Sequence, residues 1–155
     1  KTTLGKALAK KWKYQFLDLD DFFEKEYKTT ISKFVSTYGW PAFRKNESRL
    51  LKNIRPGSRM MIATGGGIIE NPESRKKIKK LGNVIYIEHS ITTLIEHLKN
   101  SKKRPNLEEH KKPSLNELES IRLALYKEAA HITLTGDNIQ KKIKLLEQQL
   151  FYHVH

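Results

Sequence analysis

The chain has 155 residues, the size of one ordinary domain that can bury a core without crosslinks, so we expect a single domain over residues 1–155. It has no cysteine and no apolar run long enough to cross a bilayer, so nothing argues for export or a membrane partner, and a cytoplasmic protein is expected. The net charge of +13 raises the question of nucleic-acid binding. However, 23 of the 30 basic residues are lysines, and many stand in short runs typical of solvated helix faces and loops. We therefore expect no nucleic-acid partner.

Apolar helical patterns alternate with short β-rich runs, which indicates an α/β fold with a parallel sheet covered by helices. The first half of the chain predicts a helix over 2–12, a strand over 14–17, helical segments over 22–27, 31–38 and 41–53, and a buried strand over 60–64. Gly39 ends one of these helical segments, and Pro41 suits the first turn of the next. We interpret the region 18–55 as a helical excursion that forms one wall of a substrate pocket.

The second half predicts a helix over 72–81, another buried strand over 83–88, a helix over 91–98, a helix over 115–129, a strand over 131–135 and a closing helix over 138–150. The stretch 100–114 is polar and twice interrupted by proline. We interpret it as a mobile lid, with a plain surface loop as the alternative.

Lys1, Thr2 and Thr3 have the form of the end of a phosphate-binding loop, whose glycines and preceding strand would lie upstream of residue 1. In such a loop the ammonium group of Lys1 reaches the terminal phosphates of a nucleotide, and the hydroxyl of Thr2 binds Mg²⁺. The three residues alone are a weak signal. The amphipathic helix that follows, and then a strand ending in acids, strengthen it.

Asp18 and Asp20 stand two residues apart where a strand is expected to end, so both side chains of an extended segment would project to the same side. One carboxylate can hold Mg²⁺ through water, and the other can accept a hydrogen bond, and a proton, from an attacking hydroxyl. The alternative is that Asp20 or Asp21 caps the helix that follows.

Arg44 follows Phe43 on a predicted helix, and its planar guanidinium group matches a carboxylate in two hydrogen bonds. Pairing with Glu47 or with another surface acid is the alternative. Gly65, Gly66 and Gly67 follow an apolar strand, where three glycines give up packing for close approach to the backbone. Amides there could donate to a substrate hydroxyl or to a γ-phosphate oxygen.

With Arg104-Pro105 and Arg122 further along, the order and spacing of these motifs resemble the shikimate kinase family, a branch of the phosphate-loop kinases, over essentially the whole chain. The resemblance implies a three-layer α/β/α fold with a central parallel sheet of about five strands, the first of them upstream of residue 1. It also implies that Asp18 lies on the magnesium side and Asp20 on the substrate hydroxyls. Arg44 falls on the arginine of the F-R motif, which clamps the substrate carboxylate.

The family's T-G-G-G motif, whose later glycines contact shikimate and the γ-phosphate, matches Gly65 to Gly67. Arg104 matches a lid arginine that swings toward the transferred phosphate, and Arg122, with Tyr126 four residues on, matches a second carboxylate-binding arginine. His97 falls where relatives often have a basic residue over the adenine. The chain departs from the pattern at Trp40, often acidic in the family, and at Asn106 in the lid.

The resemblance implies a monomeric enzyme that uses MgATP to phosphorylate the 3-hydroxyl of shikimate in aromatic amino-acid biosynthesis. Lys1, Asp20 and Arg104 would be its catalytic residues. Another small-molecule kinase of the same fold, acting on a gluconate-like substrate or a nucleotide, is the nearest alternative. A catalytically silent relative that serves as a binding module is a second.

Overall fold

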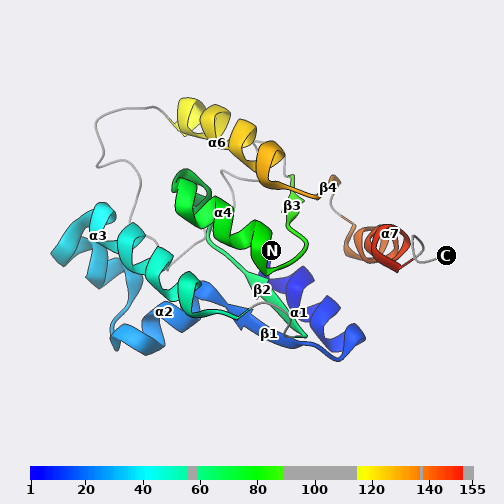
Figure 1. Cartoon of the computed structure of the whole chain (residues 1–155), viewed down its shortest axis with the longest axis horizontal. Coiled ribbons are helices and arrows are strands. Elements are labelled where there is room, and N and C mark those ends of the chain that lie inside the picture. Colours follow the sequence, from blue (N-terminus) through cyan, green and yellow to red (C-terminus); the bar gives the residue numbers. More distant parts are fainter. Residues whose placement is uncertain (56–58, 89–114, 137, 152–155) are drawn as a thin grey trace.

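The computed structural model describes residues 1–55, 59–88, 115–136 and 138–151, and for 115–119 it describes the backbone alone (Figure 1). The helices are α1 (Thr2–Trp12), α2 (Leu19–Tyr27), α3 (Ile31–Asn53), the 3-10 helix η1 (Gly66–Glu70), α4 (Pro72–Leu81), α6 (Leu115–Ala129) and α7 (Ile139–Phe151). The strands are β1 (Gln15–Asp18), β2 (Met60–Ala63), β3 (Ile85–Ile87) and β4 (Ile132–Leu134). Strands and helices alternate, as the sequence pattern predicts.

The four described strands form two parallel pairs. β1 pairs with β2 in a register that places Asp18 opposite Ala63, and β3 pairs with β4. The carboxyl ends of β1 and β2 therefore meet at one edge of the sheet, which is where α/β folds place their ligands.

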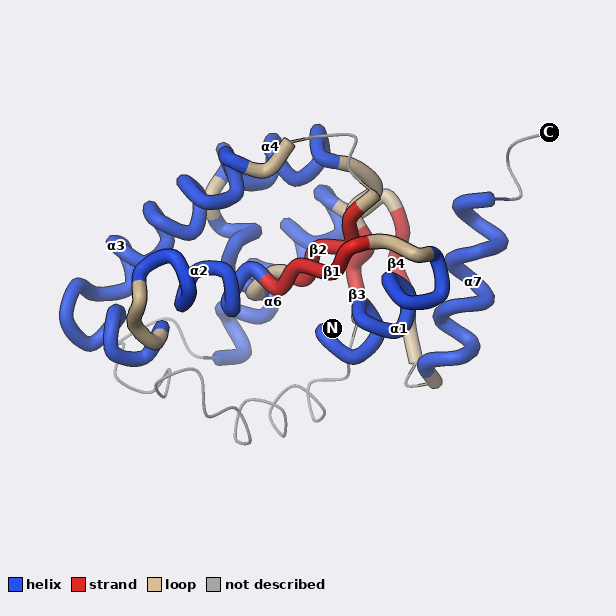
Figure 2. Tube along the Cα trace, turned by 90° about the horizontal axis from the view of Figure 1, so that it is seen from below, coloured by secondary structure: helices blue, strands red, loops and turns tan. Residues whose placement is uncertain are grey.

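Helices cover both faces of these strands, as Figure 2 shows with the strands in the middle of the molecule. Ile62 of β2 packs into a core formed mainly by α2 and α3, whereas its neighbour Met61 packs into a second core formed by α1, β4 and α7. Successive side chains of a strand point to opposite faces, so one strand supplies both cores. This arrangement is the predicted three-layer α/β/α fold.

A cavity of about 230 Å³ is lined by β2 and β3 together with α1 and α4. It explains one difference from the sequence analysis, which predicted that the strands over 60–64 and 83–88 are buried. Every residue of β2 and β3 is only half-buried, because both strands border this cavity. A strand placed there could join the two pairs into one sheet. The fifth strand, expected before Lys1, stays a prediction.

The helical region between β1 and β2 packs around two phenylalanines. Phe23 of α2 and Phe43 of α3 are each 1% exposed, and their ring centroids lie 4.8 Å apart. Gly39 interrupts α3 with φ 80° and ψ 165°, a conformation that favours glycine, so the predicted break between two helical segments is confirmed. The range Ile31–Asn53 therefore contains two helical segments that meet at a kink at Gly39.

Where α2 begins differs from the sequence interpretation. The helix starts at Leu19 instead of Phe22, because Asp18 caps it by accepting a hydrogen bond from the amide of Asp20 at 3.0 Å. Neither Asp20 nor Asp21 is the cap. Leu19 is 1% exposed, so the earlier start also buries an apolar side chain.

The other boundaries agree with the structure to within one or two residues. The helices expected over 2–12, 72–81 and 115–129 have the predicted ends. The predicted helix over 91–98, the lid over 100–114 and most of the turn after Arg55 lie outside the described residues. Within the described part of the chain, the search for a long apolar helix able to span a bilayer finds none.

Candidate functional site

Thr2 and Asp18 lie together where α1 begins and β1 ends. The Thr2 hydroxyl donates to Asp18 Oδ2 at 2.9 Å, and both side chains are half-buried. Asp18 Oδ1 accepts from the amide of Asp20, so both oxygens of this carboxylate are oriented by the chain itself. The structure therefore brings together the two residues that the sequence predicted on the magnesium side.

Hydroxyl and carboxylate oxygens are the ligands that Mg²⁺ prefers, and this ion usually takes one or two carboxylates with phosphate and water completing its shell. The Thr2 and Asp18 pair fits that donor chemistry. No cluster of three or more metal-ligating acids, histidines or cysteines exists among the described residues, so a closed, all-protein site is not built there. The chemistry suits an ion that arrives with a phosphate ligand.

Lys1 precedes α1 and lines the cavity beside β2. Thr3 is exposed in the first turn of α1. The side-chain ammonium groups of Lys1 and Lys142 thus lie near the start of α1, on the same side as the carboxylate of Asp18.

Asp20 departs from its predicted geometry. It was expected on an extended segment with Asp18, but it is the second residue of α2 and lies in the first helical turn. The expectation that Asp18 and Asp20 project to the same side because both lie on extended backbone is therefore wrong, since Asp20 lies on a helix. Asp20 still lies at the carboxyl end of β1, near the edge where β2 leads into the glycines.

The three glycines leave room for two side chains from distant parts of the chain. A Cβ added at Gly66 would lie 2.6 Å from the Tyr126 hydroxyl, which donates to the Gly66 carbonyl at 2.9 Å. A Cβ at Gly67 would overlap the guanidinium group of Arg44. The predicted close approach to this backbone is confirmed, and within this chain it is made by a tyrosine and an arginine. Gly65 precedes η1 with extended backbone.

Arg44 is anchored on α3 next to η1. Its Nη1 donates to Glu47 Oε2 at 2.8 Å, and its guanidinium carbon lies 5.3 Å and 5.1 Å from the ring centroids of Trp40 and Phe43. The Arg44 side chain is 19% exposed and that of Glu47 is 3% exposed. The pairing with Glu47, raised as an alternative from sequence, is therefore present, and it holds the arginine against Gly67 without excluding a further anion.

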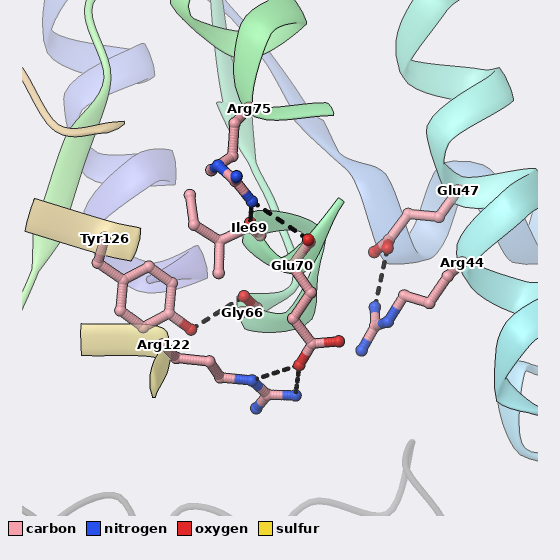
Figure 3. A network of polar contacts seen from close by, with 8 residues as sticks. All are labelled: Arg44, Glu47, Gly66, Ile69, Glu70, Arg75, Arg122 and Tyr126. Carbon is pink, nitrogen blue, oxygen red and sulfur yellow. Dashed lines mark hydrogen bonds and ion pairs between the residues drawn. The ribbon is translucent and has the colours of Figure 1, made fainter. Parts of the chain in front are cut away.

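Arg122 reaches η1 from the opposite side, on α6. Its Nε and Nη2 both donate to Glu70 Oε1, at 2.7 Å and 2.6 Å. Tyr86 of β3 stacks on Tyr126, with ring centroids 4.7 Å apart, and so helps to place this face of α6. Figure 3 shows the Glu70 carboxylate between the guanidinium groups of Arg122 and Arg44. Two arginines 78 positions apart thus converge on one short helix.

These two groups of residues share one edge of the sheet. Asp18 ends β1 opposite Ala63, the last residue of β2, and the chain then passes through Thr64 and Gly65 into η1. The acids and the arginine cluster therefore flank the same segment. Arg104 and His97 lie outside the described residues, so the structure does not place them.

Sequence reasoning missed Glu70 as part of this cluster and weighed Glu47 only as a competing partner of Arg44. Glu47 had a detectable signal, its spacing of three residues from Arg44 on a predicted helix. Glu70 had no such signal, because its partner Arg122 lies 52 residues away.

Comparisons with known proteins all indicate the same family. The family model described as "SKI: Shikimate kinase" matches residues 1–151. A shikimate kinase of Thermodesulfovibrio yellowstonii is 35% identical over 148 residues, covering 92% of this chain and 86% of the relative. One of Francisella tularensis subsp. novicida is 35% identical over 150 residues, covering 92% and 85%.

Solved structures give the same result. A shikimate kinase from Acinetobacter baumannii, in complex with shikimate, superposes with a TM-score of 0.88 at 29% identity, covering 99% of this chain and 88% of that one. The Aquifex aeolicus shikimate kinase superposes with a TM-score of 0.77 at 27% identity, covering 97% and 92%.

Proposed function

The chain belongs to the shikimate kinase family, and from this premise we propose that it transfers the γ-phosphoryl group of ATP to the 3-hydroxyl of shikimate. The products are shikimate 3-phosphate and ADP. In this transfer the bond from the γ-phosphorus to the bridging oxygen of ATP breaks and ADP leaves, while a new bond forms to the substrate oxygen, whose proton passes to the Asp20 carboxylate.

The observation that carries the proposal is the convergence of Arg44 and Arg122 on η1. A carboxylate bound between two arginines gains charge-assisted hydrogen bonds from planar groups that match its geometry. Shikimate carries one carboxylate, and the backbone of η1 is available to contact its ring, with Gly67 beside Arg44 and Gly66 beside Tyr126 of α6, the helix that carries Arg122. Arg44 and Arg122 therefore fix the substrate by its acid group. The pairing of Arg44 with Glu47 keeps the first clamp in place before substrate arrives.

Asp20, at the carboxyl end of β1, accepts a hydrogen bond from the attacking 3-hydroxyl and orients it. Gly65, Gly66 and Gly67 offer their backbone to the substrate and the γ-phosphate. Phosphoryl transfer passes through a loose transition state, so positioning and charge neutralisation contribute more than proton removal does. Alignment of the hydroxyl is therefore the main role of this carboxylate.

The nucleotide side of the site is the start of α1. Lys1 contacts the β- and γ-phosphates, Thr2 and Thr3 lie against them, and the N-terminus of the helix favours negative charge. Thr2 and Asp18 would hold Mg²⁺, which when bound neutralises charge on the phosphates. Arg104 completes the site from the proposed lid.

The test measures ADP release from MgATP with and without shikimate. The protein used includes any residues that precede Lys1. Release that requires shikimate, and that falls at least a hundredfold in Asp20→Asn, supports both the reaction and the site. Turnover with gluconate or a nucleotide in place of shikimate would assign a different kinase activity. No turnover with any of them would favour the catalytically silent alternative.

A further inference from the structure

The carboxylate of Glu70 occupies one of the two guanidinium edges of Arg122 that a carboxylate substrate can bind. Arg122 Nε and Nη2 form one edge of the guanidinium group, and both donate to the same oxygen of Glu70. That edge offers two parallel N–H groups, the arrangement that carboxylates match best. An internal acid therefore stands where an external one would bind.

The backbone of Glu70 is held in place, so it cannot retreat with η1. Arg75 Nη1 donates to the carbonyl oxygens of Ile69 and Glu70, at 2.7 Å and 3.2 Å. The next residue, Asn71, caps α4 by accepting from the amides of Glu73 and Ser74. Rotation about the side-chain bonds of Glu70 is therefore the simplest way to move its carboxylate away from Arg122.

The two partners differ in their exposure to water. The Arg122 side chain is 13% exposed, whereas that of Glu70 is 39% exposed. An ion pair with one partner this accessible contributes little net free energy, because water competes for the carboxylate. Glu70 can therefore leave at small cost. A substrate carboxylate that enters while Glu70 remains meets a like charge, since Glu70 lies between the two arginines (Figure 3).

We infer that Glu70 is a specificity-determining residue that competes with the substrate carboxylate for Arg122. This inference rests on the proposed role of Arg122 in substrate binding. Glu70 keeps the guanidinium group paired when the site is empty, and it lowers the affinity for the acidic substrate by the free energy needed to displace it. A substrate without a carboxylate gains nothing from its removal.

The experiment is isothermal titration of shikimate, and separately of its methyl ester, into the wild-type protein, Glu70→Gln and Glu70→Ala. Both variants are expected to bind shikimate roughly twofold to fivefold more tightly, the range that an exposed charge pair spans. The affinity for the ester is expected to stay at the wild-type value. Because Gln keeps the shape and the hydrogen-bond acceptor, it carries the test if the alanine variant folds poorly.

The matched control is Glu73→Gln, which removes the same charge from an exposed position three residues along. It is expected to leave both affinities unchanged. Unchanged or weaker shikimate binding in Glu70→Gln would overturn the inference and make Glu70 a residue that orients Arg122 for the substrate. An equal gain for the ester, or for Glu73→Gln, would also overturn it, because the effect would not then arise at Arg122.

The two proposals fail in different ways. If the wild-type protein phosphorylates shikimate and Glu70→Gln shows no gain in affinity, only the role of Glu70 is wrong. If the wild-type protein neither binds nor phosphorylates shikimate, the proposed function is wrong and the inference falls with it.

Discussion

The hydroxyl of Thr2 donates a 2.9 Å hydrogen bond to the carboxylate of Asp18. This contact ties the first turn of α1 to the last residue of β1 and places a hydroxyl beside an acid at the sheet edge. In the proposed site, the Thr2 hydroxyl oxygen and the Asp18 carboxylate lie on the side that binds Mg²⁺ and the nucleotide phosphates. Removal of the Thr2 hydroxyl is therefore the most informative test of the nucleotide side of the site.

Replacing Thr2 with valine removes the hydroxyl and keeps the branched shape. We expect kcat/KM for MgATP to fall roughly tenfold to a hundredfold, since an interaction with a charged group contributes about 1.5–3 kcal/mol. Steady-state kinetics at varied MgATP measure this. Thr2→Ser keeps the hydroxyl and is expected to stay within a few-fold of wild type. Wild-type kinetics in Thr2→Val would show that the hydroxyl has no part in nucleotide binding.

Arg44→Lys tests the carboxylate clamp while leaving a cation beside buried Glu47. Lysine lacks the planar fork, so the shikimate KM is expected to rise about tenfold, with a smaller change in the KM for ATP. Initial rates at varied shikimate give the value. Arg49→Lys, at an exposed position on the same helix, is the control and is expected to change neither constant. A shikimate KM within twofold of wild type in Arg44→Lys would contradict the clamp.

Gly66→Ala tests the close approach of Tyr126 to the glycine segment. The new methyl group would lie 2.6 Å from the tyrosine hydroxyl, so the tyrosine or η1 must shift. Overpacking of this kind costs about 1–3 kcal/mol of the free energy of unfolding, measurable by urea denaturation.

Two further variants separate this contact from a general effect of losing glycine. In Gly66→Ala/Tyr126→Phe the clashing oxygen is gone, so its destabilisation should be less than the sum of the single changes. Gly82 has extended backbone and no atom within 4 Å of an added Cβ, so Gly82→Ala should be nearly neutral. Additive costs in the double variant would remove Tyr126 from the account.

The carboxylate of Glu147 should make the free energy of unfolding depend on pH. Its pKa lies below the usual value, chiefly because Lys11 donates a hydrogen bond to it and also because Trp12 does, which links α7 to α1. A carboxylate with a lowered pKa in the folded state stabilises the fold above its unfolded pKa, and this contribution is lost as pH falls through the folded pKa. Glu147→Gln should therefore be less stable than wild type at pH 7.

The difference between wild type and Glu147→Gln should close as pH falls below about 4, when both carry a neutral side chain. Thermal unfolding across this range measures it. Glu26→Gln, at an exposed position on α2, is the matched control. If the difference in stability between wild type and Glu147→Gln persists at low pH, the charge of the carboxylate does not hold α7 against α1.

Local patterns predicted most of the fold. The helix over 72–81 has a capping asparagine, a proline in the first turn and apolar residues at helical spacing, and these signals lie within one short window. Gly39 marked the break in α3 for a similar reason, because a positive φ there suits glycine. Both features depend on neighbours in sequence, and the sequence predicted both.

Features that depend on distant contacts were harder to predict. The start of α2 at Leu19 combines the cap by Asp18 with burial of the Leu19 side chain, and only the burial distinguishes Asp18 from the neighbouring acids Asp20 and Asp21 as the cap. The half-buried state of β2 follows from the cavity that it shares with β3. Glu70 meets Arg122 only because η1 and α6 pack together. The residue types of the site could be predicted, whereas their pairing depends on the tertiary fold.

The most direct test of the central claim is to identify the product. The protein, including any residues that precede Lys1, should convert shikimate and MgATP to one phosphate ester of shikimate. Phosphorus–proton correlation NMR identifies the position of the phosphate. The account predicts a single phosphorus resonance coupled to the proton on carbon 3 of the ring. A phosphorus coupled to another ring proton, or no phosphorylated shikimate at all, would contradict it.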